Sequence, residues 1–140
     1  MTLDNYLQEA GALATLSGIL AGFSFSAVVQ FLANDRKGRL YTAAIVVFSV
    51  STLMFLFSLI MFIMGFAAGA ELNRVPTELD NWGTYAVLVM LGAVYVFLGG
   101  IGLAGWIPSR LAGIAATAFV LLTICLTTWG VTAVVGLFVE

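Results

Sequence analysis

The 140-residue chain is 62% hydrophobic and only 9% charged, with five basic residues, seven acidic residues and no histidine. Soluble domains carry about 25% charged residues, so a water-soluble globular fold is excluded. The absence of histidine excludes imidazole acid–base chemistry and imidazole ligation of haem or metals, and a single cysteine excludes a disulfide within the chain and a cysteine-rich metal site.

Four long stretches of the chain contain no charged residue. Each exceeds the ~20 apolar residues that a helix needs to cross a bilayer core. We therefore expect an all-α integral membrane protein whose solvent is the lipid bilayer: one domain over residues 1–140, an antiparallel four-helix bundle with short links. The expected transmembrane helices are about 10–33, 40–69, 82–105 and 111–139.

The segment ahead of the first expected helix carries a helix-start signal. Thr2 is a candidate N-cap, and Asp4 would lie near the positive end of the helix dipole. The alternative is a frayed chain end.

The first helix carries small and polar residues at spacings of three and four. Thr15, Gly22, Ser26 and Gln30 belong to this stripe, and they are the candidate lining of a permeation path. Gly18 and Gly22 also form a GxxxG motif, which indicates close helix approach in membranes. The stripe is therefore interpreted either as a packing seam or as a narrow polar path.

The later helices add further packing and polar positions. Gly65 and Gly69 form a second GxxxG, and Gly99 is a further candidate packing position in the third helix. Tyr95 lies in the middle of that helix, so its hydroxyl is expected to find a partner within the bundle. Cys125, in the fourth helix, is expected to be a small buried side chain.

Two short segments, Ala14–Gly18 and Phe48–Thr52, resemble stretches of helices 1 and 2 of Orai calcium channels, which also have four transmembrane helices. The resemblance favours a channel and assigns no residue a role. The chain departs from that family in two ways. The Orai pore helix carries an outer glutamate, whereas 10–33 contains none. Orai begins in the cytosol with a basic extension, whereas the charge distribution described next places the N-terminus of this chain outside.

Charge distribution predicts the orientation. Arg36, Lys37 and Arg39 in the first link and Arg110 in the third are expected on the cytoplasmic side, where basic residues accumulate. Both termini and the middle link are then outside, in a membrane that we expect to be a bacterial inner membrane.

The outer side is acidic, and Glu9 and Glu71 are its candidate rim. In a symmetric oligomer such a rim would concentrate cations at a pore mouth. In a monomer it would be a solvated surface.

These sequence features limit the classes of function that we expect. No enzymatic activity is expected, because no serine or threonine within a span has a base beside it. No metal, cofactor or nucleic-acid partner is expected. The leading hypothesis is a small, self-associating membrane channel or pore-like permeation protein, with cations as the candidate permeant. The alternatives are a non-catalytic accessory or scaffold subunit that docks a larger membrane partner, and a small uncoupled carrier.

Overall fold

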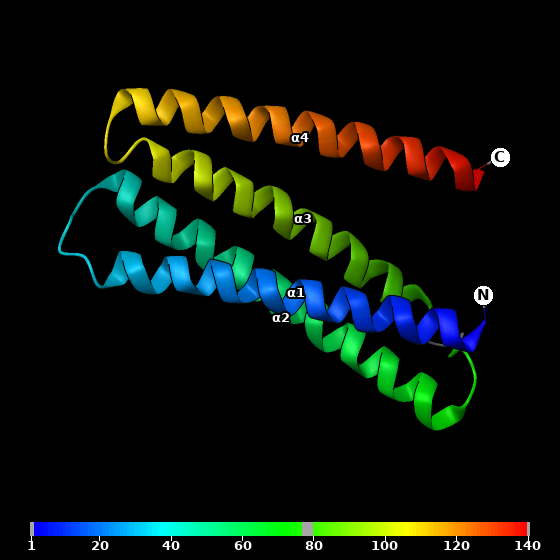
Figure 1. Cartoon of the computed structure of the whole chain (residues 1–140). Helices are drawn as coiled ribbons and strands as arrows, with labels where there is room; N and C mark the ends of the chain where they lie inside the picture. The colour runs from blue at the N-terminus through cyan, green and yellow to red at the C-terminus, as the bar shows by residue number, and fades with distance from the viewer. Residues whose placement is uncertain (1, 77–79, 140) are drawn as a thin grey trace.

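The computed structural model describes residues 2–76 and 80–139, and these form four α-helices (Figure 1). In chain order they are α1 (Leu3–Leu32), α2 (Arg39–Leu72), α3 (Asp80–Gly105) and α4 (Arg110–Val139). The shortest, α3, has 26 residues, and at 1.5 Å per residue it is about 39 Å long. All four helices are therefore long and apolar enough to cross a membrane.

The first helix begins well before the expected start at residue 10. The Thr2 hydroxyl accepts a hydrogen bond from the Asn5 backbone N–H at 3.3 Å, and Asp4 lies in the first turn. A capped start with a carboxylate near the positive dipole end stabilises these extra turns. The N-cap prediction for Thr2 is thus confirmed, and the frayed alternative is wrong.

The second helix also extends past its expected end at residue 69. It continues to Leu72 and stops where Asn73 takes a left-handed backbone conformation, with φ of 50°. Asparagine tolerates this conformation better than most residues and commonly ends a helix in this way.

The charged links divide between the two ends of the molecule. The first and third links lie at one end, whereas the chain termini and the α2–α3 link lie at the other (Figure 1). Arg36, Lys37 and Arg39 therefore share one end with the start of α4, and this end is called the basic end below. Glu78 and Glu140, which belong to the acidic side in the sequence, lie outside the described residues.

The core is formed by α1, α2 and α3, with α2 in contact with both neighbours. Buried positions on α2 alternate at spacings of three and four, which keeps one seam facing its neighbours. These positions are Tyr41, Ala44, Phe48, Ser51, Phe55, Ser58, Phe62, Gly65 and Gly69, and Thr52 beside Ser51 is also buried. The apolar centre combines Phe55 and Phe62 with Ala21 of α1 and with Ala86, Met90 and Ala93 of α3.

The fourth helix packs chiefly against α3 (Figure 1). Close approach is possible where α3 carries glycine: Gly102 faces Val120, and Gly105 faces Ala116. Most of the remaining α4 surface is exposed. The expected four-helix bundle is therefore an open arrangement, in which three helices share a core and the fourth lies at its edge.

Candidate functional site on the outer face of α1 and at the two ends

The four candidate path residues share the exposed side of α1. Thr15, Gly22, Ser26 and Gln30 are all exposed, on the side away from the buried seam of this helix. That seam consists of Ala10, Ser17, Ala21, Ser24 and Val28. The polar stripe predicted from the sequence is thus an outer surface of the chain and lines nothing within it. It is called the α1 outer face below.

The polar groups of the α1 outer face differ in how they are satisfied. The Thr15 hydroxyl donates to the Gly11 carbonyl at 2.9 Å, which is the common behaviour of threonine in an apolar helix. The side chains of Ser26 and Gln30 form no hydrogen bond with the described residues. Ile19 and Phe23 are also exposed on this side, so the face alternates polar and apolar positions.

A second polar group lies inside the core, and sequence reasoning missed it. Ser17, Ser24, Ser51 and Ser58 are completely buried. The Ser24 and Ser51 hydroxyls are 3.3 Å apart, Ser51 donates to the Ala93 carbonyl at 3.2 Å, and Ser58 donates to the Ala86 carbonyl at 3.0 Å. These bonds join the three core helices.

The sequence signal for this serine seam was the spacing of seven residues within each pair, at 17 and 24 and at 51 and 58. Seven residues are two helical turns, so each pair lies on one side of its helix. The serines alternate with Phe55, which is also completely buried. The seam is closed, because none of these side chains has exposed surface.

The five candidate packing glycines have different surroundings. A side chain at Gly65 or Gly69 would come within 2.9 Å of the Tyr6 ring or its hydroxyl, so both glycines make room for this tyrosine of α1. Gly18 faces Leu59 at ordinary contact distance. Gly22 and Gly99 have no such neighbour within 4 Å and are exposed. Gly18, Gly65 and Gly69 therefore lie at contacts between helices, whereas Gly22 and Gly99 lie on the outer surface.

The two rim carboxylates lie at the acidic end of the molecule. Glu9 and Glu71 are both exposed, and neither forms an ion pair with the described residues. Glu9 also borders a cavity of about 890 Å³ between α1, α2 and α3. Its walls are mainly apolar, with Met61, Phe62 and Trp82 among them. A solvated carboxylate at the mouth of an apolar cavity favours cations over anions.

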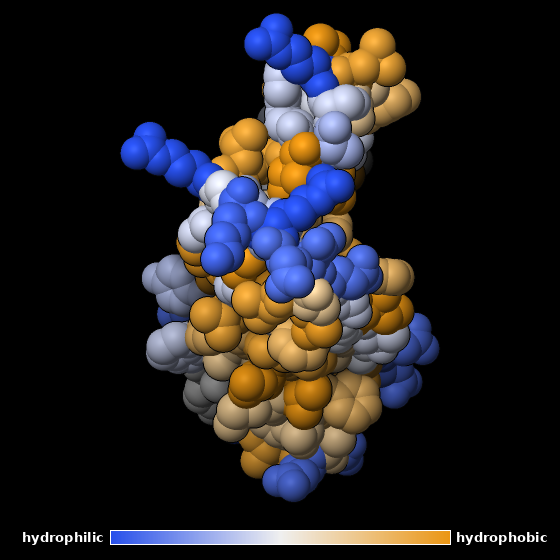
Figure 2. Space-filling model, turned by 90° about the vertical axis from the view of Figure 1, so that its left-hand side faces the viewer, coloured by the Kyte–Doolittle hydropathy of each residue, from blue (hydrophilic) through white to orange (hydrophobic). Residues whose placement is uncertain are grey.

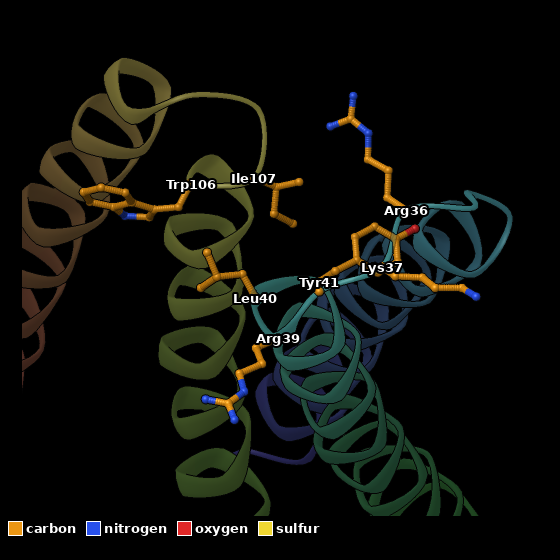
Figure 3. A pocket seen from close by; sticks show the side chains of 8 residues that line it. Arg36, Lys37, Arg39, Leu40, Tyr41, Trp106 and Ile107 are labelled. Carbon is orange, nitrogen blue, oxygen red and sulfur yellow. The ribbon is translucent and has the colours of Figure 1, made fainter.

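The basic end contains a second hollow, of about 500 Å³. Residues 36–41 line it from the first link and the start of α2, and Trp106 and Ile107 line it from the end of α3 (Figure 3). Figure 2 looks onto this end and shows long hydrophilic side chains projecting from a largely hydrophobic surface. Segments far apart in the sequence therefore meet at one charged hollow.

Two further expectations can be compared with the structure. The Tyr95 hydroxyl bonds the Thr128 hydroxyl at 2.9 Å, so the predicted partner exists and lies on α4. Cys125 is exposed, so the expectation that it is buried is wrong. The reason is that α4 packs along one side only, and Cys125 lies outside that contact.

Within residues 2–76 and 80–139, no three His, Cys, Asp or Glu residues are grouped closely enough to hold a metal ion. Comparison with protein-family models, with curated proteins and with solved structures found no match.

Proposed function

We propose that the protein is a small homo-oligomeric membrane channel in which the α1 outer face lines the permeation path. The observation that carries this proposal is the division of polar groups on α1. Ser24 on the buried side is hydrogen-bonded across the core, whereas Ser26 and Gln30 on the exposed side have no hydrogen-bond partner among the described residues. Ser17 and Thr15 are the exceptions: the buried Ser17 hydroxyl has no partner in the described part of the chain, and the exposed Thr15 hydroxyl donates to the Gly11 carbonyl.

Exposure of unpaired polar side chains to lipid would cost a single chain free energy. An amide without a hydrogen-bond partner costs several kcal/mol in a hydrocarbon environment. Association of several chains around α1 would place Gln30 and Ser26 against water or against neighbouring copies. The open Gly22 would also permit close approach of helices at that axis.

A path between copies also agrees with the closed core. The serine seam and Phe55 have no exposed surface, so these described residues line no solute route along the core of a single chain. Water-filled channels formed by bundles of helices use the faces that the protomers turn toward a common axis. The α1 outer face combines small, polar and exposed positions.

The charges at the two ends of the molecule support an orientation in the membrane and favour cations as the permeant. The basic end would face the cytoplasm under the positive-inside rule, and both termini would face outside a bacterial inner membrane. Glu9 and Glu71 would then surround the outer mouth, several copies of each. Acidic rings of this kind raise the local concentration of cations.

Flux measurements in liposomes test the proposal. The purified chain is expected to pass monovalent cations, and Gly22→Leu, Ser26→Leu and Gln30→Leu are each expected to reduce that flux to near background. Gly130→Leu on α4 is the matched control for Gly22→Leu, because Gly130 is also exposed and has no neighbour within 4 Å. Unchanged flux in all three α1 variants would contradict the proposal.

A second function is favoured by one observation. Ile19 and Phe23 make part of the α1 outer face apolar, which suits the docking of a helix from a larger membrane partner. An accessory subunit of this kind would conduct nothing when purified alone. Native mass spectrometry distinguishes the two functions: a homo-oligomer supports the channel, and a stoichiometric complex with another chain supports the accessory subunit.

A further inference from the structure

We infer that the hollow at the basic end binds the phosphate group of an anionic membrane phospholipid. The inference rests on the membrane location in the proposed function, and it is independent of whether the protein conducts. The hollow joins residues 36–41 to Trp106 and Ile107, so a ligand there would bridge the first link and the end of α3.

Positive charge around the hollow is not neutralised by the chain. Arg36, Lys37 and Arg39 form no ion pair with the described residues, and Asp35 is the one acid in the first link. Figure 3 shows Arg36 rising beside the hollow, while Lys37 and Arg39 extend away from it in different directions. The flexible stems of these side chains allow their charges to converge on an anion, and guanidinium groups suit phosphate oxygens.

The helix starts at this end add to the unbalanced charge. Arg39 begins α2 and Arg110 begins α4, and neither helix has an acidic residue in its first turn. The N-cap of α2 is Gly38, which provides no side-chain hydrogen bond. Positive side chains at positive dipole ends repel, whereas an anion in the hollow, which the start of α2 lines, is attracted to that dipole end.

The apolar walls favour a lipid over a soluble phosphate. Leu40 at the start of α2 and Ile107, two residues after the end of α3, line the hollow (Figure 3). Trp106 also borders the hollow and is partly exposed, and its ring lies toward α4 (Figure 3), where the indole N–H donates to the Thr117 hydroxyl at 3.0 Å. Tryptophan at a membrane interface lies at headgroup depth. A phosphate bound by the first link would therefore leave its acyl chains beside apolar side chains.

The opposite wall of the hollow is also held in place. The Tyr41 hydroxyl bonds the carbonyl oxygens of Phe31 and Asn34, and its ring packs edge-on against Phe31 with centroids 5.2 Å apart. These contacts tie the start of α2 to the end of α1. Both walls of the hollow thus exist before a lipid arrives, and only the long basic side chains need to move.

Native mass spectrometry of protein released from nanodiscs tests the inference. The probes are phosphatidylglycerol and phosphatidylcholine, and the protein is expected to retain phosphatidylglycerol in preference. The triple variant Arg36→Gln, Lys37→Gln and Arg39→Gln is expected to weaken that retention about 100-fold, since each basic residue near an anionic surface contributes about fivefold. Lys37→Gln alone is expected to weaken it about fivefold.

The controls separate the hollow from general charge and from folding. Arg74→Gln removes one charge at the opposite end, and it is expected to leave retention unchanged. Helix content of each variant, measured by circular dichroism, identifies any that misfold, and the single Lys37→Gln variant then carries the test. Equal retention by the wild type and the basic-end variants would overturn the inference. Displacement of the lipid by inorganic phosphate alone would overturn its assignment as a lipid site.

Retention does not depend on flux. A protein that retains phosphatidylglycerol through these residues and conducts nothing would support the inference while contradicting the channel. A protein that conducts and shows no preference between the two lipids would support the channel and contradict the lipid site.

Discussion

Helices α2 and α4 are both long and strongly apolar, yet they pack very differently. In the most apolar stretch of α2, 33% of residues are buried, against 11% in α4. In α2, phenylalanine, serine and glycine recur on one seam, and Ser51 and Ser58 donate to carbonyls of α3. In α4, by contrast, Thr123 and Thr132 donate to carbonyls of their own helix.

Hydropathy and packing are therefore separate properties of a membrane helix. Lipid is as apolar as a leucine side chain, so apolar composition provides no drive for one helix to seek another. Close packing and hydrogen bonds between helices decide which helix is central. The following predictions test that distinction by making the same kind of change in both helices.

The largest effect is expected from Phe55→Ala. Phe55 is completely buried, and it packs with Phe97 at a centroid distance of 6.5 Å. Its truncation leaves a cavity between three helices, so the free energy of unfolding should fall by about 3–5 kcal/mol. Phe119→Ala on α4 is the matched control, because Phe119 is 71% exposed and should cost little. Unfolding by SDS in bicelles measures both, and equal losses would contradict the distinction.

A smaller loss is expected from Gly100→Ala. A methyl group on Gly100 would lie 3.0–3.2 Å from the Phe48 ring. That ring cannot easily give way, because it packs between Phe31 and Phe97. Overpacking of this kind should lower the free energy of unfolding by about 1–3 kcal/mol. Gly130→Ala on α4 meets nothing within 4 Å, and should instead raise it by about 0.5–1 kcal/mol. The same sign in both variants would argue against the packing described here.

Two alanine substitutions in the serine seam are expected to change the free energy of unfolding in opposite directions. Ser51→Ala removes bonds to the Ala93 carbonyl and to Ser24, and should lower the free energy of unfolding by about 0.6–1.7 kcal/mol. Ser17→Ala should raise it by about 1 kcal/mol, because the buried Ser17 hydroxyl has no partner among the described residues. Thr123→Ala on α4 should change it little. Loss of stability in Ser17→Ala would show that this hydroxyl is satisfied after all, for example by a bound water.

The smallest effect is expected at the boundary between α3 and α4. Tyr95→Phe removes the hydrogen bond to Thr128 and should lower the free energy of unfolding by about 0.6 kcal/mol. Because this bond joins α4 to the core, amide exchange should accelerate in α4 and remain unchanged in α2. Exchange followed by mass spectrometry separates the two helices. Acceleration in α2 as well would mean that α4 supports the core.

The sequence predicted much of the framework and little of the candidate site's surroundings. Uncharged length identified the four helices, and the Thr2 signal identified an earlier start of α1. Ser26 and Gln30 were found by their polarity, but the sequence could not say which side of α1 they occupy relative to the core. A serine stripe and a glycine stripe both lie on α1, at Ser17 and Ser24 and at Gly18 and Gly22. Spacing alone does not show which of the two stripes faces the core.

The number of helices, their apolar character and the segregation of charge could be read from the amino-acid sequence, because these follow from local composition and from the cost of moving charge into lipid. Only the tertiary structure decided that the serine seam is buried, that the α1 outer face is free and that α4 lies at the edge. The physical reason is that helix association in an apolar medium depends on shape and hydrogen-bond partners. Those partners are supplied by residues far away in the chain, such as Ala93 for Ser51 and Tyr6 for Gly65 and Gly69.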